Sequence, residues 1–169
     1  MNSGNVEAVK KHISNGGEES KKIKDVFSRA VQLDHAEIVD LLLASGTDLK
    51  AKLDGLLHQV KSVEVANLLI ENGANVNASS QFGGTPLHSI ISHRSLEMNQ
   101  NNTVQLVGIL ITKGANVNAV NGQGRTPLDL LYSSGMPGNP AAEAAAPSGP
   151  LAELLRKHGG KTGMEIGIE

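Results

Sequence analysis

The six histidines are the residues of this chain best suited to bind a metal ion or to transfer protons near neutral pH. A helical zinc site commonly places two histidines four residues apart on one helix face, with a third ligand close by. Here the two nearest histidines, His88 and His93, are five residues apart, and no carboxylate has an obvious place beside them. The sequence therefore indicates neither a metal site nor a histidine-based active site.

The segment Gly159-Gly160-Lys161-Thr162 is similar to the end of a phosphate-binding loop. The full pattern requires a glycine where this chain has Leu155, and a strand before the loop. A leucine-rich helical run precedes the segment instead. The segment is better explained as the end of a helix and the start of a tail. Because the chain has no other catalytic pattern, we expect a protein that is not an enzyme and has no cofactor.

Composition and charge argue against several further functions. The 169 residues carry a formal net charge of −2, so there is no basic excess to bind a nucleic acid backbone. The absence of cysteine excludes disulfides and thiolate metal sites. No apolar run reaches the roughly 18 residues of a transmembrane helix, and the N-terminal residues lack the apolar stretch of a signal peptide. We expect a cytoplasmic monomer that binds neither nucleic acid nor membranes, with a secreted effector as the open alternative.

Two stretches of the chain are almost identical. Residues 71–78 read ENGANVNA, and residues 112–119, 41 positions later, read TKGANVNA. Each is followed by a second shared motif, Thr85-Pro86-Leu87-His88 in one case and Thr126-Pro127-Leu128-Asp129 in the other. Because both motifs recur at the same spacing, they mark a structural repeat. Repeats of this length bury their apolar faces against their neighbours.

A glycine follows each of five leucine-rich runs in which apolar residues have helical spacing, as in Leu106, Ile109 and Leu110. Glycine readily adopts the left-handed conformation that ends many helices, because it has no Cβ atom. We therefore expect a helix, here called the outer helix of each repeat, before each glycine. Positive φ is expected at the second, third and fourth. The glycines are Gly16, Gly46, Gly73, Gly114 and Gly159.

A shorter inner helix should precede each outer helix. Thr85 and Thr126 suit the N-cap position, and the proline after each suits the first helical position. In the second repeat, Asp25-Val26-Phe27-Ser28 takes the place of this motif. In the third repeat, Leu56-Leu57-His58 is its remnant.

Polar, glycine-rich turns connect the later repeats. We call NASSQFGG at residues 77–84 the first tip and NAVNGQGR at residues 118–125 the second tip. The T-P-L-H motif, the leucine-rich second helix, the glycine at its end and these turns together resemble ankyrin repeats, over residues 5 to about 163. The resemblance implies an all-α ankyrin-like repeat solenoid, built of helix–loop–helix units and hairpin-like turns, with about four and a half repeats.

The repeats are expected to differ in length. We predict a single ankyrin-like domain over residues 1–163 and a C-terminal tail at 164–169. Insertions at about 93–102 and 134–150 are most simply tolerated surface loops, because added loop length costs little closure entropy. The predicted repeats cover about residues 1–19, 20–51, 52–78, 79–119 and 120–163.

The resemblance also assigns structural roles. In ankyrin repeats the histidine of T-P-L-H makes local hydrogen bonds and braces neighbouring repeats, and His88 and His58 match that position. His35 matches the start of an outer helix. Asn77 and Asn118 match the asparagines whose side chains tie one turn to the next.

Ankyrin-like domains bind partners through their turn tips and the exposed face of their inner helices. Phe82 is the foremost candidate, since an aromatic side chain at a tip is a typical anchor. The alternative is that it packs on the adjacent turn. Tyr132, on an inner helix, is either a core residue or a contact. The matching positions are Gln81, Phe82, Gly84, Ser92, His93, Gly122, Gln123, Arg125, Ser133 and Ser134, with Gln32 and Leu33 in the second repeat.

The sequence thus predicts a non-catalytic protein–protein interaction module with a protein partner. The alternative is a regulatory or targeting ankyrin segment of a larger enzyme or effector protein. The boundaries of the complete gene would separate the two.

Overall fold

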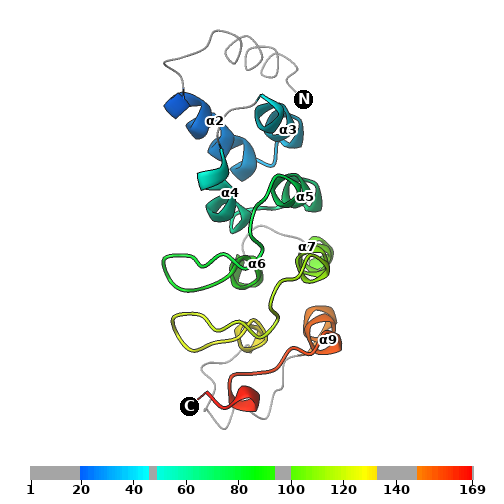
Figure 1. The fold of residues 1–169 in the computed structure, drawn as a ribbon. Coiled ribbons are helices and arrows are strands. Elements are labelled where there is room, and N and C mark those ends of the chain that lie inside the picture. The colour runs from blue at the N-terminus through cyan, green and yellow to red at the C-terminus, as the bar shows by residue number, and fades with distance from the viewer. Residues whose placement is uncertain (1–19, 46–48, 94–99, 133–147, 169) are drawn as a thin grey trace. The chain divides into compact units, whose positions relative to one another are not determined.

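The computed structural model describes residues 20–45, 49–93, 100–132 and 148–168. The chain divides into two compact parts, an N-terminal part of residues 1–75 and a C-terminal part of residues 76–169. Within the described ranges the regular structure is helical throughout and includes no strand (Figure 1).

The N-terminal part consists of two helix pairs. Its helices are α2 (Ser20–Gln32), α3 (Ala36–Ala44), α4 (Lys50–Leu57) and α5 (Val63–Glu71). α2 packs against α3 and α4 against α5, and the pairs stack because α2 also contacts α4 and α3 contacts α5 (Figure 1). Buried side chains recur three or four residues apart along each helix, so each turns one apolar face inward.

The inner helix of the second repeat is longer than expected. α2 has 13 residues and α3 has nine, so the prediction that the inner helix is the shorter one is wrong here. The predicted register holds at Phe27, which is fully buried, as Leu87 is in the fourth repeat. α2 begins at Ser20, well before Asp25, because no proline comparable to Pro86 fixes its first turn.

The motif predicted in the third repeat is wrong in register. Leu56 and Leu57 form the end of α4, and His58 is its C-cap residue, not a residue near the helix start. Leu53, Leu56 and Leu57 are buried, and their i, i+3, i+4 spacing decides which face of α4 points inward. His58 is also buried, so a structural role is supported at a different position of the repeat.

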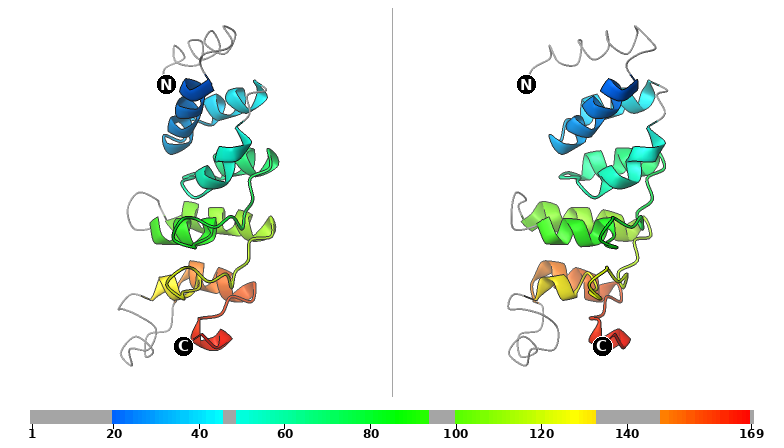
Figure 2. Two further views of the ribbon diagram at one scale, coloured as in Figure 1. Left: turned by 60° about the vertical axis from the view of Figure 1, so that its left-hand side comes forward. Right: turned by 90° about the vertical axis from the view of Figure 1, so that its left-hand side faces the viewer.

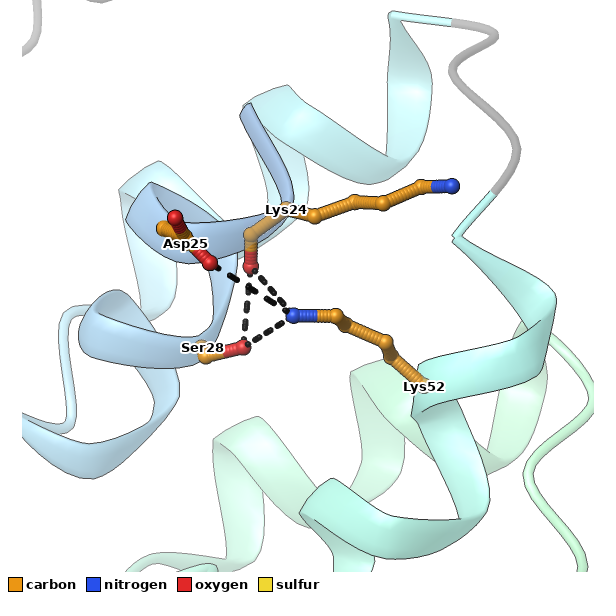
Figure 3. A network of polar contacts seen from close by, with 4 residues as sticks. All are labelled: Lys24, Asp25, Ser28 and Lys52. Atoms are coloured by element: carbon orange, nitrogen blue, oxygen red, sulfur yellow. Dashed lines mark hydrogen bonds and ion pairs between the residues drawn. The ribbon is translucent and has the colours of Figure 1, made fainter. Parts of the chain in front are cut away.

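Lys52 connects the two inner helices of the N-terminal part (Figure 3). Its Nζ donates to the backbone carbonyl of Lys24 and to Ser28 Oγ, both at 3.2 Å, and lies 3.8 Å from an Asp25 carboxylate oxygen. Asp25 is largely exposed, so this ion pair contributes little. The two hydrogen bonds add a polar contact between α2 and α4.

Asp34 and Ser62 connect two turns of the same part. Asp34 has a φ of +60°, a left-handed conformation that aspartate tolerates better than most residues. Ser62, the N-cap residue of α5, accepts a hydrogen bond from Val65 N and donates one to Asp34 Oδ1 at 2.5 Å. The turn after α2 is thereby held at the start of α5.

The C-terminal part contains longer outer helices and shorter inner ones. Its elements are α6 (Pro86–His93), α7 (Gln100–Thr112), the 3-10 helix η1 (Asp129–Leu131), α9 (Pro150–Lys157) and the 3-10 helix η2 (Met164–Ile166). α7 packs beside α6 and also contacts α9 of the next layer, and η1 packs on α6 (Figures 1 and 2). Leu87, Leu106, Leu110 and Leu155 are fully buried between these elements.

The helix predicted after Thr126 is only a 3-10 turn. α6 begins at Pro86, as predicted, whereas η1 has three residues and ends at Leu131, and its C-cap residue Tyr132 is extended, with a ψ of 123°. Tyr132 is half-buried. The inner helix of the fifth repeat therefore keeps the start signal of α6 but not its length.

The predicted insertions are only partly described. α7 begins at Gln100, so residues 100–102 belong to a helix and not to an insertion loop, and Pro150 is the first residue of α9. Most of both insertions, at 94–99 and 134–147, lies outside the described residues, as do the first repeat (1–19), Gly16 and Gly46.

The remaining glycines end outer helices as predicted. Gly73, Gly114 and Gly159 follow α5, α7 and α9 with φ of +101°, +92° and +80°. After each, the next residue donates its N–H back into the last helical turn, as Ala74 N does to Leu69 O at 2.9 Å. This is the bonding pattern of a glycine-terminated helix.

Substituting alanine for Gly73 should lower the free energy of unfolding by about 1 kcal/mol, through strain at positive φ. A Cβ atom there meets nothing within 4 Å, so crowding adds no cost. Gly55 is the matched control, because it lies inside α4, equally uncrowded. Gly55→Ala should instead stabilise by about 0.5–1 kcal/mol. Urea denaturation of both variants checks the pair of signs, and destabilisation by Gly55→Ala would contradict the helix bounds.

Candidate functional site

Both tips form the same backbone turn. In the first tip, Ser80 N donates to Gly84 O at 2.8 Å and Gly83 N donates to Ser80 O at 2.9 Å. Residues 121–125 of the second tip repeat both bonds, each at 3.0 Å. Gly83 and its counterpart in the second tip have φ of +74° and +76°, which glycine adopts without penalty.

The two tips are joined by a backbone hydrogen bond. Gly122 N donates to Phe82 O at 3.0 Å, and the two loops run side by side in Figure 1. A Cβ atom on Gly122 would lie 2.7 Å from Phe82 O, and one on Gly83 would lie 2.8 Å from Gly122 N. Glycine at both positions is therefore what allows the tips to meet.

Asparagine side chains tie each tip to the helix end of the next repeat, as the resemblance implied. Asn77 Nδ2 donates to Gly114 O at 2.9 Å, and Asn77 Oδ1 accepts from Asn116 N at 2.7 Å. Asn118 makes the same two bonds to Gly159 O and Lys161 N, at 2.9 and 2.7 Å. Each amide satisfies one backbone donor and one acceptor, so the tips are held rigidly at their bases.

His88 braces the first tip against the second, also as expected. Its Nδ1 accepts from Thr85 N at 3.2 Å, so the neutral ring carries its proton on Nε2. Nε2 then donates to the carbonyl of Arg125 at 3.0 Å. Burial lowers the pKa of His88 below its usual value, while the carbonyls of Arg125 and Ala119 and the charge of Asp129 oppose that shift.

Asp129 takes the place of His88 in the following repeat and repeats its contacts with the threonine three residues earlier, but it accepts a bond from the next segment where His88 donates one. Its Oδ2 accepts from Thr126 N at 2.8 Å, from Thr126 Oγ1 at 3.0 Å and from Gly163 N at 2.9 Å. Thr126 Oγ1 also lies 2.8 Å from Lys161 O. Asp129 thus binds the segment that follows α9 to the start of η1.

Residues 162–168 form a further turn that sequence reasoning assigned to a tail. Thr162 N donates to a Glu165 carboxylate oxygen at 2.6 Å, and Glu165 N donates to Thr162 Oγ1 at 3.3 Å. The bond from Thr162 N and that from its hydroxyl hold the pKa of Glu165 below its usual value. Threonine followed three residues later by glutamate is the capping-box pattern, and it could have revealed this turn.

The structure brings most of the predicted contact residues to the surface of the C-terminal part. Gln81, Phe82, Ser92, His93, Gly122 and Gln123 are exposed there, and Arg125 is half-buried. Gly84 is buried, with a Cβ position 3.4 Å from His88 Cβ, so its assignment to an accessible surface is wrong. Ser133 and Ser134 lie outside the described residues. Gln32 and Leu33 are exposed at the end of α2, in the N-terminal part.

Phe82 is the most exposed large apolar residue among those described. Its residue surface is 76% accessible, although its N–H is bonded to Ser80 Oγ and its carbonyl to Gly122 N. A ring packed on the adjacent turn would be largely covered. The backbone is thus fixed while the ring projects outward.

The described part of the chain gives no evidence of a metal site or of a phosphate-binding loop. No three histidine, cysteine or acidic residues there are grouped as metal ligands would be. At the glycine-rich segment after α9, Gly160 N donates to Leu155 O and Lys161 N to Asn118 Oδ1, so these amides are already occupied. Over the same ranges, no helix has the length and apolarity needed to cross a membrane.

Comparison with known proteins agrees with the geometry. A family model described as ankyrin repeats, three copies, matches residues 56–159. Comparison with curated protein sequences found no match. The matched residues make up more than half of the chain and contain both tips, the asparagine ties and the His88 brace. Together with the all-helical architecture, this shows that the chain belongs to the ankyrin-repeat family.

Proposed function

We propose that this chain is a non-catalytic module that binds a partner protein through the two tips and the adjoining end of α6. Ankyrin repeats are generally protein–protein interaction modules, and their domains are typically non-catalytic. The outward-facing ring of Phe82, on a backbone held by neighbouring residues, is the observation that carries the proposal.

The chemistry of the tips suits a neutral or apolar contact. Within the two tips, residues 77–84 and 118–125, the only charged side chain is that of Arg125. Gln81 and Gln123 are exposed beside Phe82 and Gly122, and their amides can donate and accept hydrogen bonds. A central aromatic ring surrounded by adaptable polar groups is the composition found at binding hot spots.

Replacing Phe82 with alanine should weaken partner binding by about 1–2 kcal/mol or more and leave the melting temperature nearly unchanged. Arg125→Ala tests the second tip in the same way. The partner is first captured with the full chain and then titrated against each variant by calorimetry, with thermal melting measured in parallel.

Met164→Ala is the matched control. Met164 is also exposed, at 56%, and lies in η2, outside both tips. The Met164→Ala variant should bind the partner as tightly as the wild type does. If Phe82→Ala melts early and binds weakly only because it unfolds, the ring has a structural role. If both tip variants melt and bind normally, the contact surface lies elsewhere.

A further inference from the structure

The second tip contains a dipeptide with reactivity of its own. In Asn121-Gly122, the backbone nitrogen of glycine can attack the side-chain amide carbon of asparagine, because glycine has no side chain to obstruct the approach. The nitrogen loses its proton as it bonds to Cγ, ammonia leaves, and a five-membered succinimide forms. Water then opens the ring at either carbonyl, which gives aspartate or isoaspartate. The net change consumes one water and releases one ammonia.

The structure restrains both reacting groups. Gly122 N, the attacking atom, donates its proton to Phe82 O at 3.0 Å. Asn121 Oδ1 accepts from Gln123 N at 2.9 Å and from Arg125 N at 3.0 Å, which fixes the orientation of the amide under attack. The reaction needs the nitrogen free and the amide rotated toward it. The first condition fails while the tips remain in contact, and the second fails while Asn121 Oδ1 keeps its two bonds within the second tip.

We propose that Asn121 is a deamidation site gated by the contact between the two tips, reacting only when Gly122 separates from Phe82. The reaction would place a carboxylate in a surface whose only charged side chain is that of Arg125. The isoaspartate product would also lengthen the backbone where Gly122 meets Phe82. Opening of one tip is thus converted into a lasting change of charge and shape.

The test compares rates of deamidation at Asn121 by peptide mass mapping after incubation in mildly alkaline buffer. In the wild-type chain, Asn121 should react at least about tenfold more slowly than in a free peptide of residues 118–126, because only the open population reacts. Gly83→Ala should remove most of that protection, since its Cβ would lie 2.8 Å from Gly122 N and force the tips apart.

Gly149→Ala is the matched control in the same part of the chain. Gly149 has the same kind of strain, at φ +95°, but its Cβ would meet nothing within 4 Å. It should leave the Asn121 rate near that of the wild type. Asn72, which also precedes a glycine, is an internal reference that neither substitution touches.

A second measurement uses the wild-type chain alone, so the proposal stays testable if Gly83→Ala fails to fold. Because every reacting molecule must first free Gly122 N, the protection of Asn121 against deamidation should be at least as large as the protection of the Gly122 amide against hydrogen exchange. The proposal is overturned if wild-type Asn121 reacts as fast as the peptide, if both alanine variants accelerate it equally, or if Asn121 is less protected than the Gly122 amide.

Discussion

Replacing Asp129 with alanine should lower the free energy of unfolding of the C-terminal part by about 2–4 kcal/mol. Asp129 is only 2% exposed, and its Oδ2 accepts from Thr126 N, Thr126 Oγ1 and Gly163 N. Removal leaves two backbone N–H groups without their acceptor, at about 1–3 kcal/mol each. The other carboxylate oxygen, Oδ1, is buried with no hydrogen-bond partner, so alanine also relieves an unfavourable burial. The net loss is therefore below the sum of the bonds.

Replacing Asp129 with asparagine separates the effect of the lost hydrogen bonds from the effect of the lost side-chain volume. Asp129→Asn retains one carbonyl oxygen to accept from Thr126 N and Gly163 N, and should cost about 1 kcal/mol or less. Urea denaturation gives the two losses, and hydrogen exchange at the Gly163 amide should accelerate in the alanine variant alone. An alanine variant within about 0.5 kcal/mol of the wild type would show that Asp129 does not hold the end of the chain in place.

Local chemistry made part of the fold predictable. A left-handed helix end is a property of the glycine itself, so Gly73, Gly114 and Gly159 could be placed from sequence. Thr85-Pro86 marks the start of α6 because threonine suits the N-cap position and proline suits the first helical position, which are also local properties. The ties made by Asn77 and Asn118 could also be predicted, because the family resemblance supplied partners that no local rule specifies.

Errors arose where tertiary contacts decide the outcome. In the third repeat no threonine or proline marks the inner helix, and the burial of Leu53, Leu56 and Leu57 sets the register of α4. The turn of η2 is too short for hydrophobic periodicity to reveal, although the capping-box pattern of Thr162 and Glu165 marks its start. Its place beside η1 depends on the bond from Gly163 N to Asp129, between residues 34 positions apart.

The candidate site likewise has features that local sequence predicts and features that only tertiary contacts decide. Sequence placed Phe82 and Gln123 at tips, and both are exposed. It could not show that Gly84 is buried against His88, nor that Gly122 must be glycine to approach Phe82 O. Those constraints come from neighbouring segments and have no local signature.

Replacing His88 with alanine should cost about 2–4 kcal/mol of unfolding free energy. The imidazole is 3% exposed and accepts from Thr85 N through Nδ1, while Nε2 donates to Arg125 O. Alanine leaves both backbone groups without this partner and opens a cavity under the tips. Thermal and urea unfolding measure the loss, and hydrogen exchange at the Thr85 amide locates it.

A dependence on pH should distinguish this histidine from a side chain that merely fills space. Burial disfavours the charged imidazolium, so the folded state favours neutral His88 and its pKa is lowered. Protonation of Nδ1 would also turn the acceptor of the Thr85 N–H bond into a donor. In the unfolded chain a histidine titrates at about pH 6.5. Between that pH and the lower folded value the unfolded state binds more protons, so stability falls on acidification. The contribution of His88 is fully present above about pH 6.5, with a slope no steeper than about 1.4 kcal/mol per pH unit.

His88→Asn is the control, because its side-chain oxygen can still accept from Thr85 N but does not titrate. The measured quantity is the difference in unfolding free energy between the wild type and His88→Asn across the acidic range. Most contributions from other titrating groups cancel in this difference. Asp129, the acid whose charge reaches His88, remains in both proteins. The advantage of the wild type should shrink as pH falls below about 6.5. A difference that stays constant would mean that folding does not perturb the titration of His88, and one that grows with acidification would mean that His88 is held protonated and that its ring bonds run the opposite way.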